Sequence, residues 1–138
     1  MTKKAIAILL IVIILIIVSP VLPFKNIPKV FIVVSGSMEP AIKTGSLAIT
    51  LPVLQKDIKQ NDIVAFTSPS DPKETILHRI IFIKSTIPFN YQTKGDKNDF
   101  PDNWDLMGVG ILGKYIFSIP YIGYLINYIK SPFGYLIS

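Results

Sequence analysis

The sequence contains no cysteine and only one histidine, His78. The absence of cysteine excludes a disulfide framework, a thiol nucleophile and any thiolate metal site. Its 14 basic and 9 acidic residues give a net charge of +5, but the lysines are scattered along the chain. No basic and aromatic cluster is present of the kind that binds nucleic acid, so a nucleic-acid partner is not expected. A mild positive charge is better suited to anionic lipid headgroups.

One long apolar run is present near the amino terminus. Residues 5–24 carry no charge and include IAILLIVIILIIV, and about twenty such residues span a bilayer core. The run predicts a transmembrane α-helix that serves as a retained anchor over residues 1–24. A cleavable secretory signal is the alternative, but the run is longer than such signals have, and Pro20 and Pro23 offer no small-x-small cleavage site. Lysines flank both ends, so charge alone leaves the orientation open.

After the anchor, residues 25–114 predict one small, mainly β domain. Short apolar or β-branched runs alternate with turn residues, as in an antiparallel sheet. The first, VFIVV at residues 30–34, is interpreted as a buried strand. Two stretches, residues 68–73 and 95–103, are the most turn-like, the first typical of a hairpin loop and the second of an Asx-rich turn. The other expected strands cover residues 46–53, 62–67, 75–86, 89–93 and 109–117.

The last segment, residues 115–138, is apolar and aromatic, but proline, asparagine and lysine interrupt it before a membrane-spanning length is reached. Its tyrosines favour headgroup depth, so a tail lying at the membrane interface is expected. A tail packed on the core is the alternative, and a second transmembrane helix is disfavoured.

Ser37 lies in SGSMEP, directly after the first expected strand. A tight turn at that place projects the hydroxyl and supplies backbone amides for a developing oxyanion. An ordinary serine turn before a proline has the same pattern. Ser37 is therefore a candidate nucleophile that needs a base nearby.

His78 lies in TILHRIIFIK, where Ile76, His78, Ile80 and Phe82 share one face by the two-residue period of a strand. A neutral imidazole on a rigid strand is a suitable base for a serine. A buried core histidine is the alternative. Arg79 faces the other side and is expected to be structural.

Acidic residues gather in GDKNDFPD, where Asp96, Asp99 and Asp102 lie close in sequence. Such residues commonly brace a turn. One of them could instead orient the imidazole and stabilise the imidazolium, as the third member of a triad does. A metal site is the weaker interpretation, because calcium loops need a different spacing, and no cofactor is expected.

Taken together, these residues resemble signal peptidase I over almost the whole chain. The resemblance rests on the anchor, the strand, SGSMEP, NDIV, HRI, and KGDKN followed by Asp102. The sequence is most similar to the archaeal and endoplasmic-reticulum branch, in which histidine replaces the lysine base of the usual bacterial enzymes. A departure is Gly45-Ser46, where many relatives have Gly-Asp; we expect it to affect a turn and not the chemistry.

The resemblance implies a serine endopeptidase that removes signal peptides from secretory preproteins. Ser37 would be the nucleophile, His78 the base, Asp96 and Asp102 the acidic residues required for activity, and Ser35 the hydroxyl that binds the oxyanion with the Ser37 amide. Which aspartate contacts His78 stays open. The resemblance also implies a compact β-sheet domain on the outer or lumenal face, a cytoplasmic amino terminus and an apolar surface near the lipid bilayer. Accessory membrane subunits or the translocation channel are further partners to consider.

Two other interpretations remain open. The chain could be a noncatalytic, membrane-tethered β domain in which Ser37, His78 and Asp96 are structural. It could also be a related processing peptidase with a narrow set of substrates, which sequence alone does not separate from a general signal peptidase.

Overall fold

The computed structural model describes residues 2–18 and 26–130. In chain order, its elements are α1 (Lys3–Val18), β1 (Lys29–Ile32), β2 (Leu47–Leu51), a 3₁₀ turn (Gln55–Asp57), β3 (Ile63–Thr67), β4 (Thr75–Thr86), β5 (Phe89–Lys94), β6 (Leu106–Met107), a second 3₁₀ turn (Gly108–Gly110), β7 (Ile111–Ile119) and α2 (Ile122–Lys130).

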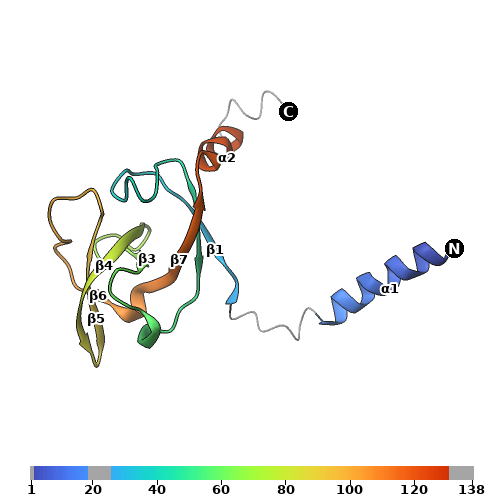
Figure 1. Cartoon of the computed structure of the whole chain (residues 1–138), viewed down its shortest axis with the longest axis horizontal. Helices are drawn as coiled ribbons and strands as arrows, with labels where there is room; N and C mark the ends of the chain where they lie inside the picture. Colours follow the sequence, from blue (N-terminus) through green and yellow to red (C-terminus); the bar gives the residue numbers. More distant parts are fainter. Residues whose placement is uncertain (1, 19–25, 131–138) are drawn as a thin grey trace.

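Within the described residues, seven strands form one sheet in the order β1-β2-β7-β3-β4-β5-β6. Every neighbouring pair is antiparallel. The last strand, β7, lies between β2 and β3 and so separates these two consecutive strands in the sheet. Figure 1 shows β1 and β7 along one side of the body and β4, β5 and β6 along the other. The expected mainly β, antiparallel domain is confirmed.

The hydrophobic core lies around β3, β4 and β5. Val64, Ala65 and Phe66 of β3 are all fully buried, because this strand is central and pairs with β4 and β7. Burying one large apolar side chain stabilises the fold by about 1.5–3 kcal/mol. The core cluster consists of Ile58, Val64, Phe66, Ile80, Tyr91 and Leu106.

The first strand differs from expectation, because it is not buried. β1 is an edge strand with one neighbour, β2. Val30 is exposed, and Val34, beyond the end of the strand, is 79% exposed. A continuous run of apolar residues is typical of a strand that is buried on both faces. In β1 the same pattern belongs to an edge strand with one uncovered face.

β4 has the expected bounds, Thr75–Thr86, but its single apolar face was only partly right. His78 and Ile80 are buried, whereas Phe82 is 58% exposed. The register with β5 shifts between Ile80 and Phe82, and such a bulge turns the following side chains to the other face. Ile83 packs against the core in place of Phe82.

The carboxy-terminal boundary expected at residue 115 falls inside β7. Residues 115–119 belong to the sheet, where Tyr115 pairs with Thr50 and Ile119 with Leu47. The expected strand over residues 109–117 already overlapped the expected tail over residues 115–138, and the structure extends the strand to Ile119. After β7, α2 covers Ile122–Lys130, and residues 131–138 lie outside the described residues.

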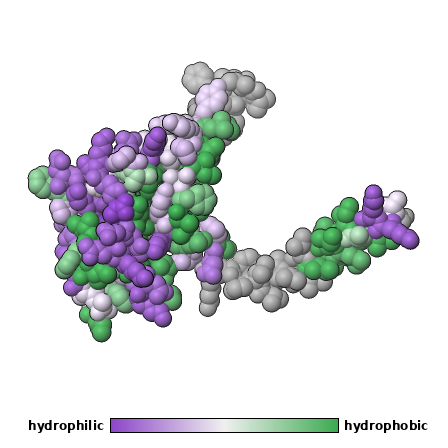
Figure 2. Space-filling model, viewed as in Figure 1, coloured by the Kyte–Doolittle hydropathy of each residue, from purple (hydrophilic) through white to green (hydrophobic). Residues whose placement is uncertain are grey.

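The amino-terminal helix α1 covers most of the expected anchor. Its sequence is KKAIAILLIVIILIIV, and residues 19–24 of the expected span lie outside the described residues. Among the residues that the structure describes, no helix is long and apolar enough to cross a membrane. Figure 2 shows hydrophobic residues along α1, and also along α2 and the neighbouring side of the body.

Candidate active site

Ser37 lies on a tight turn between β1 and β2. The Glu39 amide donates to the Gly36 carbonyl (3.0 Å), and the Ile42 amide donates to the Met38 carbonyl (2.9 Å). Met38 and Ile42 are almost completely buried and anchor the turn in the body. The Ser37 hydroxyl therefore projects from a turn that is held in place by these two buried side chains.

His78 approaches Ser37 from the middle of β4. The distance from His78 Nε2 to Ser37 Oγ is 3.2 Å. His78 is 7% exposed, and its imidazole packs edge-on against Phe66, with ring centroids 6.3 Å apart. Packing of this kind limits the imidazole to few orientations, which is what a base for Ser37 requires.

Asp102 contacts the other side of the imidazole. His78 Nδ1 lies 2.7 Å from Asp102 Oδ2, and both side chains are almost fully buried. The Thr93 hydroxyl donates to the same carboxylate oxygen (2.6 Å). The Asp102 amide donates to the Thr93 carbonyl (2.9 Å). Ser37, His78 and Asp102 thus form a continuous chain of side-chain contacts.

Asp96 has a different partner. Arg79 donates from Nε to Asp96 Oδ1 (2.8 Å) and from Nη2 to Oδ2 (2.7 Å). These hydrogen bonds, more than the Coulomb attraction, lower the pKa of Asp96 and raise that of Arg79. Arg79 Nη1 also donates to the Asn61 carbonyl (2.8 Å). Asp96 therefore braces the loop after β5 against β4, and the structure pairs Asp102, not Asp96, with His78.

Ser35 lies beside Ser37, with their hydroxyl oxygens 3.3 Å apart. The loop after β5 is hydrogen-bonded to the turn that carries Ser37, because the Lys97 amide donates to the Ser37 carbonyl (2.8 Å). Asp99 is exposed on the same loop. In residues 2–18 and 26–130, no three His, Asp or Glu side chains form a group that could hold a metal ion.

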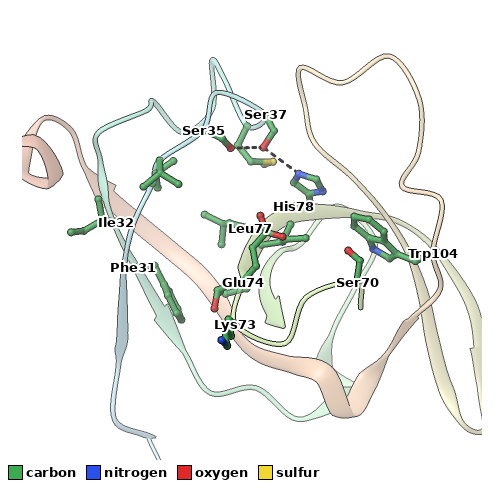
Figure 3. Close-up of a pocket in the computed structure, with 16 residues that line it drawn as sticks. Phe31, Ile32, Ser35, Ser37, Ser70, Lys73, Glu74, Leu77, His78 and Trp104 are labelled. Carbon is green, nitrogen blue, oxygen red and sulfur yellow. Dashed lines mark hydrogen bonds between the residues drawn. The ribbon is translucent and has the colours of Figure 1, made fainter. Parts of the chain in front are cut away.

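A cleft of about 720 Å³ opens in front of Ser37 and His78. Figure 3 shows Phe31 directed into this cleft from β1, whereas Ile32 points away. Leu77 lies on its floor, Trp104 on the side opposite β1, and Lys73 and Glu74 at the end away from Ser37. The cleft has room for an extended peptide, with apolar side chains near the serine and charged ones farther away.

The sequence predicted Ser37 and His78, which the structure brings within hydrogen-bond reach of each other, but two residues beside them were not predicted. Thr93, the hydrogen-bond donor to Asp102, is an ordinary strand residue until β5 is paired with β4, where it lies opposite Ile80. Trp104, the only tryptophan, enters the cleft from the loop before β6. The one signal in the sequence that could have suggested a role is that this single tryptophan follows the acidic stretch.

Comparison with known proteins places these features in a family. The model of the signal peptidase family, peptidase S26, matches residues 3–84, more than half of the chain. That range includes Ser35, Ser37 and His78, and it ends before Asp96 and Asp102.

A related protein is Signal peptidase I W of Bacillus subtilis (strain 168), which is 32% identical over 91 residues. The match covers 64% of this chain and 47% of the relative, so the chain spans about half the length of that curated relative. The chain belongs to the signal peptidase family, peptidase S26.

Proposed function

We propose that the protein is a membrane-bound serine endopeptidase that removes N-terminal signal peptides from secretory preproteins. The observation that carries the proposal is the contact chain from Ser37 Oγ through His78 to Asp102, with distances of 3.2 and 2.7 Å. Histidine as the base matches the archaeal and endoplasmic-reticulum type of signal peptidase rather than the type with a lysine base.

In the first half of the reaction, Ser37 Oγ attacks the carbonyl carbon of the scissile bond while its proton moves to His78 Nε2. The Ser37 amide and the Ser35 hydroxyl stabilise the oxyanion. Asp102 accepts the hydrogen bond from Nδ1, fixes the tautomer and stabilises the imidazolium. As the intermediate collapses, the C–N bond breaks and His78 returns the proton to the leaving amine, leaving an acyl-enzyme on Ser37.

In the second half, His78 takes a proton from water, and the resulting hydroxide attacks the acyl ester. Collapse of this second intermediate breaks the ester bond, returns the proton to Ser37 Oγ and releases the carboxylate of the signal peptide. Asp96 has no part in these proton transfers in this scheme. Its role is to hold the loop that contains Asp102, through its ion pair with Arg79.

We further propose that residues 1–24 anchor the protein in the cell membrane, with a cytoplasmic amino terminus and the β domain on the outer or lumenal face. The apolar sequence of α1 after Lys4 supports anchoring, and membership of a signal-peptidase family supports a site facing translocated preproteins. Accessory membrane subunits and the translocation channel are candidate partners. The segment after residue 119 would then lie at the interface, since Tyr121, Tyr124 and Leu125 are exposed on or beside α2.

The test is cleavage of a synthetic preprotein by the full chain in liposomes, with the cut site located by mass spectrometry. The wild type is expected to cut once, at the end of the signal, and Ser37→Ala to lose the activity. Ser70→Ala is the matched control, because Ser70 lines the same cleft but hydrogen-bonds with Ser68. Equal cleavage by wild type and Ser37→Ala would refute the assignment of the nucleophile, and absence of cleavage by the wild type would favour a noncatalytic β domain.

A further inference from the structure

The loop that carries Ser37 is closed on itself. We call residues 33–46 the nucleophile loop. The Val33 amide donates to the Ser46 carbonyl (2.9 Å), and the Gly45 amide donates to the Val33 carbonyl (2.8 Å). These bonds tie the two ends of the loop together next to β1 and β2. The position of Ser37 therefore depends on the contacts that this closed loop makes with neighbouring segments.

One side of the nucleophile loop is supported by the loop after β5. The Lys97 amide donates to the Ser37 carbonyl. A Cβ at Gly95 would lie 2.8 Å from that same carbonyl oxygen, so only glycine permits this close approach. This support acts directly on the backbone of Ser37.

The opposite support comes from α2, far away in sequence. The Gly123 amide donates to the Gly45 carbonyl (2.9 Å). A Cβ at Gly123 would lie 2.7 Å from that oxygen and 2.9 Å from Ile32 Cγ2. Figure 1 shows α2 at the end of β7, beside the part of the sheet where β1 lies. The helix is thus hydrogen-bonded to the nucleophile loop through its backbone.

The aromatic side chains of α2 extend this contact. Gly45 has a φ of +79°, and a Cβ there would lie within 1.9 to 2.4 Å of the ring of Tyr124. The ring therefore lies directly against Gly45, where any side chain would displace it. Tyr121 and Tyr124 also line a second pocket, of about 310 Å³, together with loop residues Glu39, Pro40, Lys43 and Thr44.

We propose that α2 is a positioning element for Ser37, acting through Gly123 and Tyr124 on the nucleophile loop. The helix presses the loop from one side while the Gly95–Lys97 turn holds it from the other, so that Ser37 Oγ stays within reach of His78. Displacements of about 1 Å at a reacting group can cost about a hundredfold in rate. The inference rests on the proposed function, since it concerns the reactivity of Ser37.

The experiment compares Tyr124→Ala with Tyr124→Phe in the full chain in liposomes, using the synthetic preprotein as substrate. Loss of the ring is expected to lower kcat about tenfold and to change KM by no more than about twofold, because Tyr124 itself does not line the cleft in front of Ser37. The phenylalanine variant keeps the ring and is expected to retain wild-type kcat. Leu125→Ala is the control for a general effect of α2, since Leu125 is 55% exposed.

Hydrogen–deuterium exchange supplies a readout that does not depend on cleavage. In Tyr124→Ala, amides of residues 33–46 are expected to exchange faster, while amides of β3 and β4 keep wild-type protection. Unchanged kcat and exchange in this variant would overturn the proposal, as would a rise in KM at constant kcat. If Tyr124→Ala does not fold, Gly123→Ala, which intrudes by a single methyl group, is measured in the same way. A wild type that does not cleave would refute the proposed function itself.

Discussion

Two aspartates of one loop have separate partners, and a single substitution in each separates their roles. Asp102→Asn keeps the shape of the side chain but removes the charge that faces His78 Nδ1. Cleavage is expected to fall by about three to four orders of magnitude, because an amide can hold the wrong tautomer and does not stabilise the imidazolium. Initial rates of cleavage by the purified variant measure this loss, and circular dichroism checks that the variant is folded.

Asp96→Asn is the comparison for that measurement, because Asp96 is bonded to Arg79 and not to His78. It is expected to retain far more activity per folded molecule than Asp102→Asn. If Asp96→Asn loses as much activity while staying folded, Asp96 has a direct part in the chemistry and the proposed division of roles is wrong.

The ion pair of Asp96 also predicts how stability depends on pH. Hydrogen bonds from Arg79 lower the pKa of Asp96 from its ordinary value of 3.8. The Asp96 carboxylate therefore binds a proton less tightly in the folded state than in the unfolded state. The contribution of the ion pair to stability is present above the unfolded pKa and is lost as pH falls through the folded pKa. The free energy of unfolding of wild type is expected to exceed that of Asp96→Asn by about 1–3 kcal/mol near neutral pH. Urea unfolding below about pH 4 should show the difference shrinking, and a difference that is independent of pH would contradict the assignment.

At the scale of single elements, β4 shows how far sequence periodicity reaches. Its bounds and the burial of His78 and Ile80 follow from the alternating pattern. The bulge that exposes Phe82 does not, because it arises from the register with β5. The position of such a register shift depends on both strands and cannot be predicted from the sequence of one.

The same limit applies to the site. SGSMEP and the single histidine predicted Ser37 and His78 before any strand was paired. The choice between Asp96 and Asp102, and the part played by Thr93, depend on how the loop after β5 folds back over β4. That path is set by contacts between distant segments, such as Arg79 with Asp96, and so could not be read from spacing.

The exposed and buried positions of β4 predict opposite responses to truncation. Ile80→Ala removes a fully buried side chain from the core and is expected to destabilise the fold by about 2–5 kcal/mol. Phe82→Ala, at an exposed position two residues away, is expected to cost less than about 1 kcal/mol. Denaturant midpoints at constant m-value provide the comparison. Equal losses in the two variants would mean that Phe82 is buried and that the bulge is wrongly placed.

On the scale of the whole molecule, β1, β2 and β7 form a sheet with two unlike faces. Cross-strand partners share a face, and the register places Ile32, Leu47 and Ile119 in one row and Val30, Ile49 and Phe117 in the next. This outer apolar face is partly exposed, whereas Ala48 and Thr50, on the opposite face, are fully buried. Exposed apolar side chains that gather on one face mark a contact surface, and the apolar α1 and the aromatic α2 favour the proposed lipid interface as its partner.

The absence of native cysteine makes that assignment measurable. Phe117→Cys and Phe82→Cys each introduce one thiol, at positions that are 51% and 58% exposed in the native chain. Each variant is labelled with an environment-sensitive fluorophore in the full chain and reconstituted in liposomes. The label at position 117 is expected to be quenched by lipid-borne nitroxide, because the proposed lipid contact puts the outer face of β7 at headgroup depth. Position 82 lies on β4, on the other side of the body in Figure 1, and is expected to be quenched only by soluble iodide. If both positions respond alike, the outer apolar face does not contact lipid, and a protein partner becomes the better explanation for its exposure.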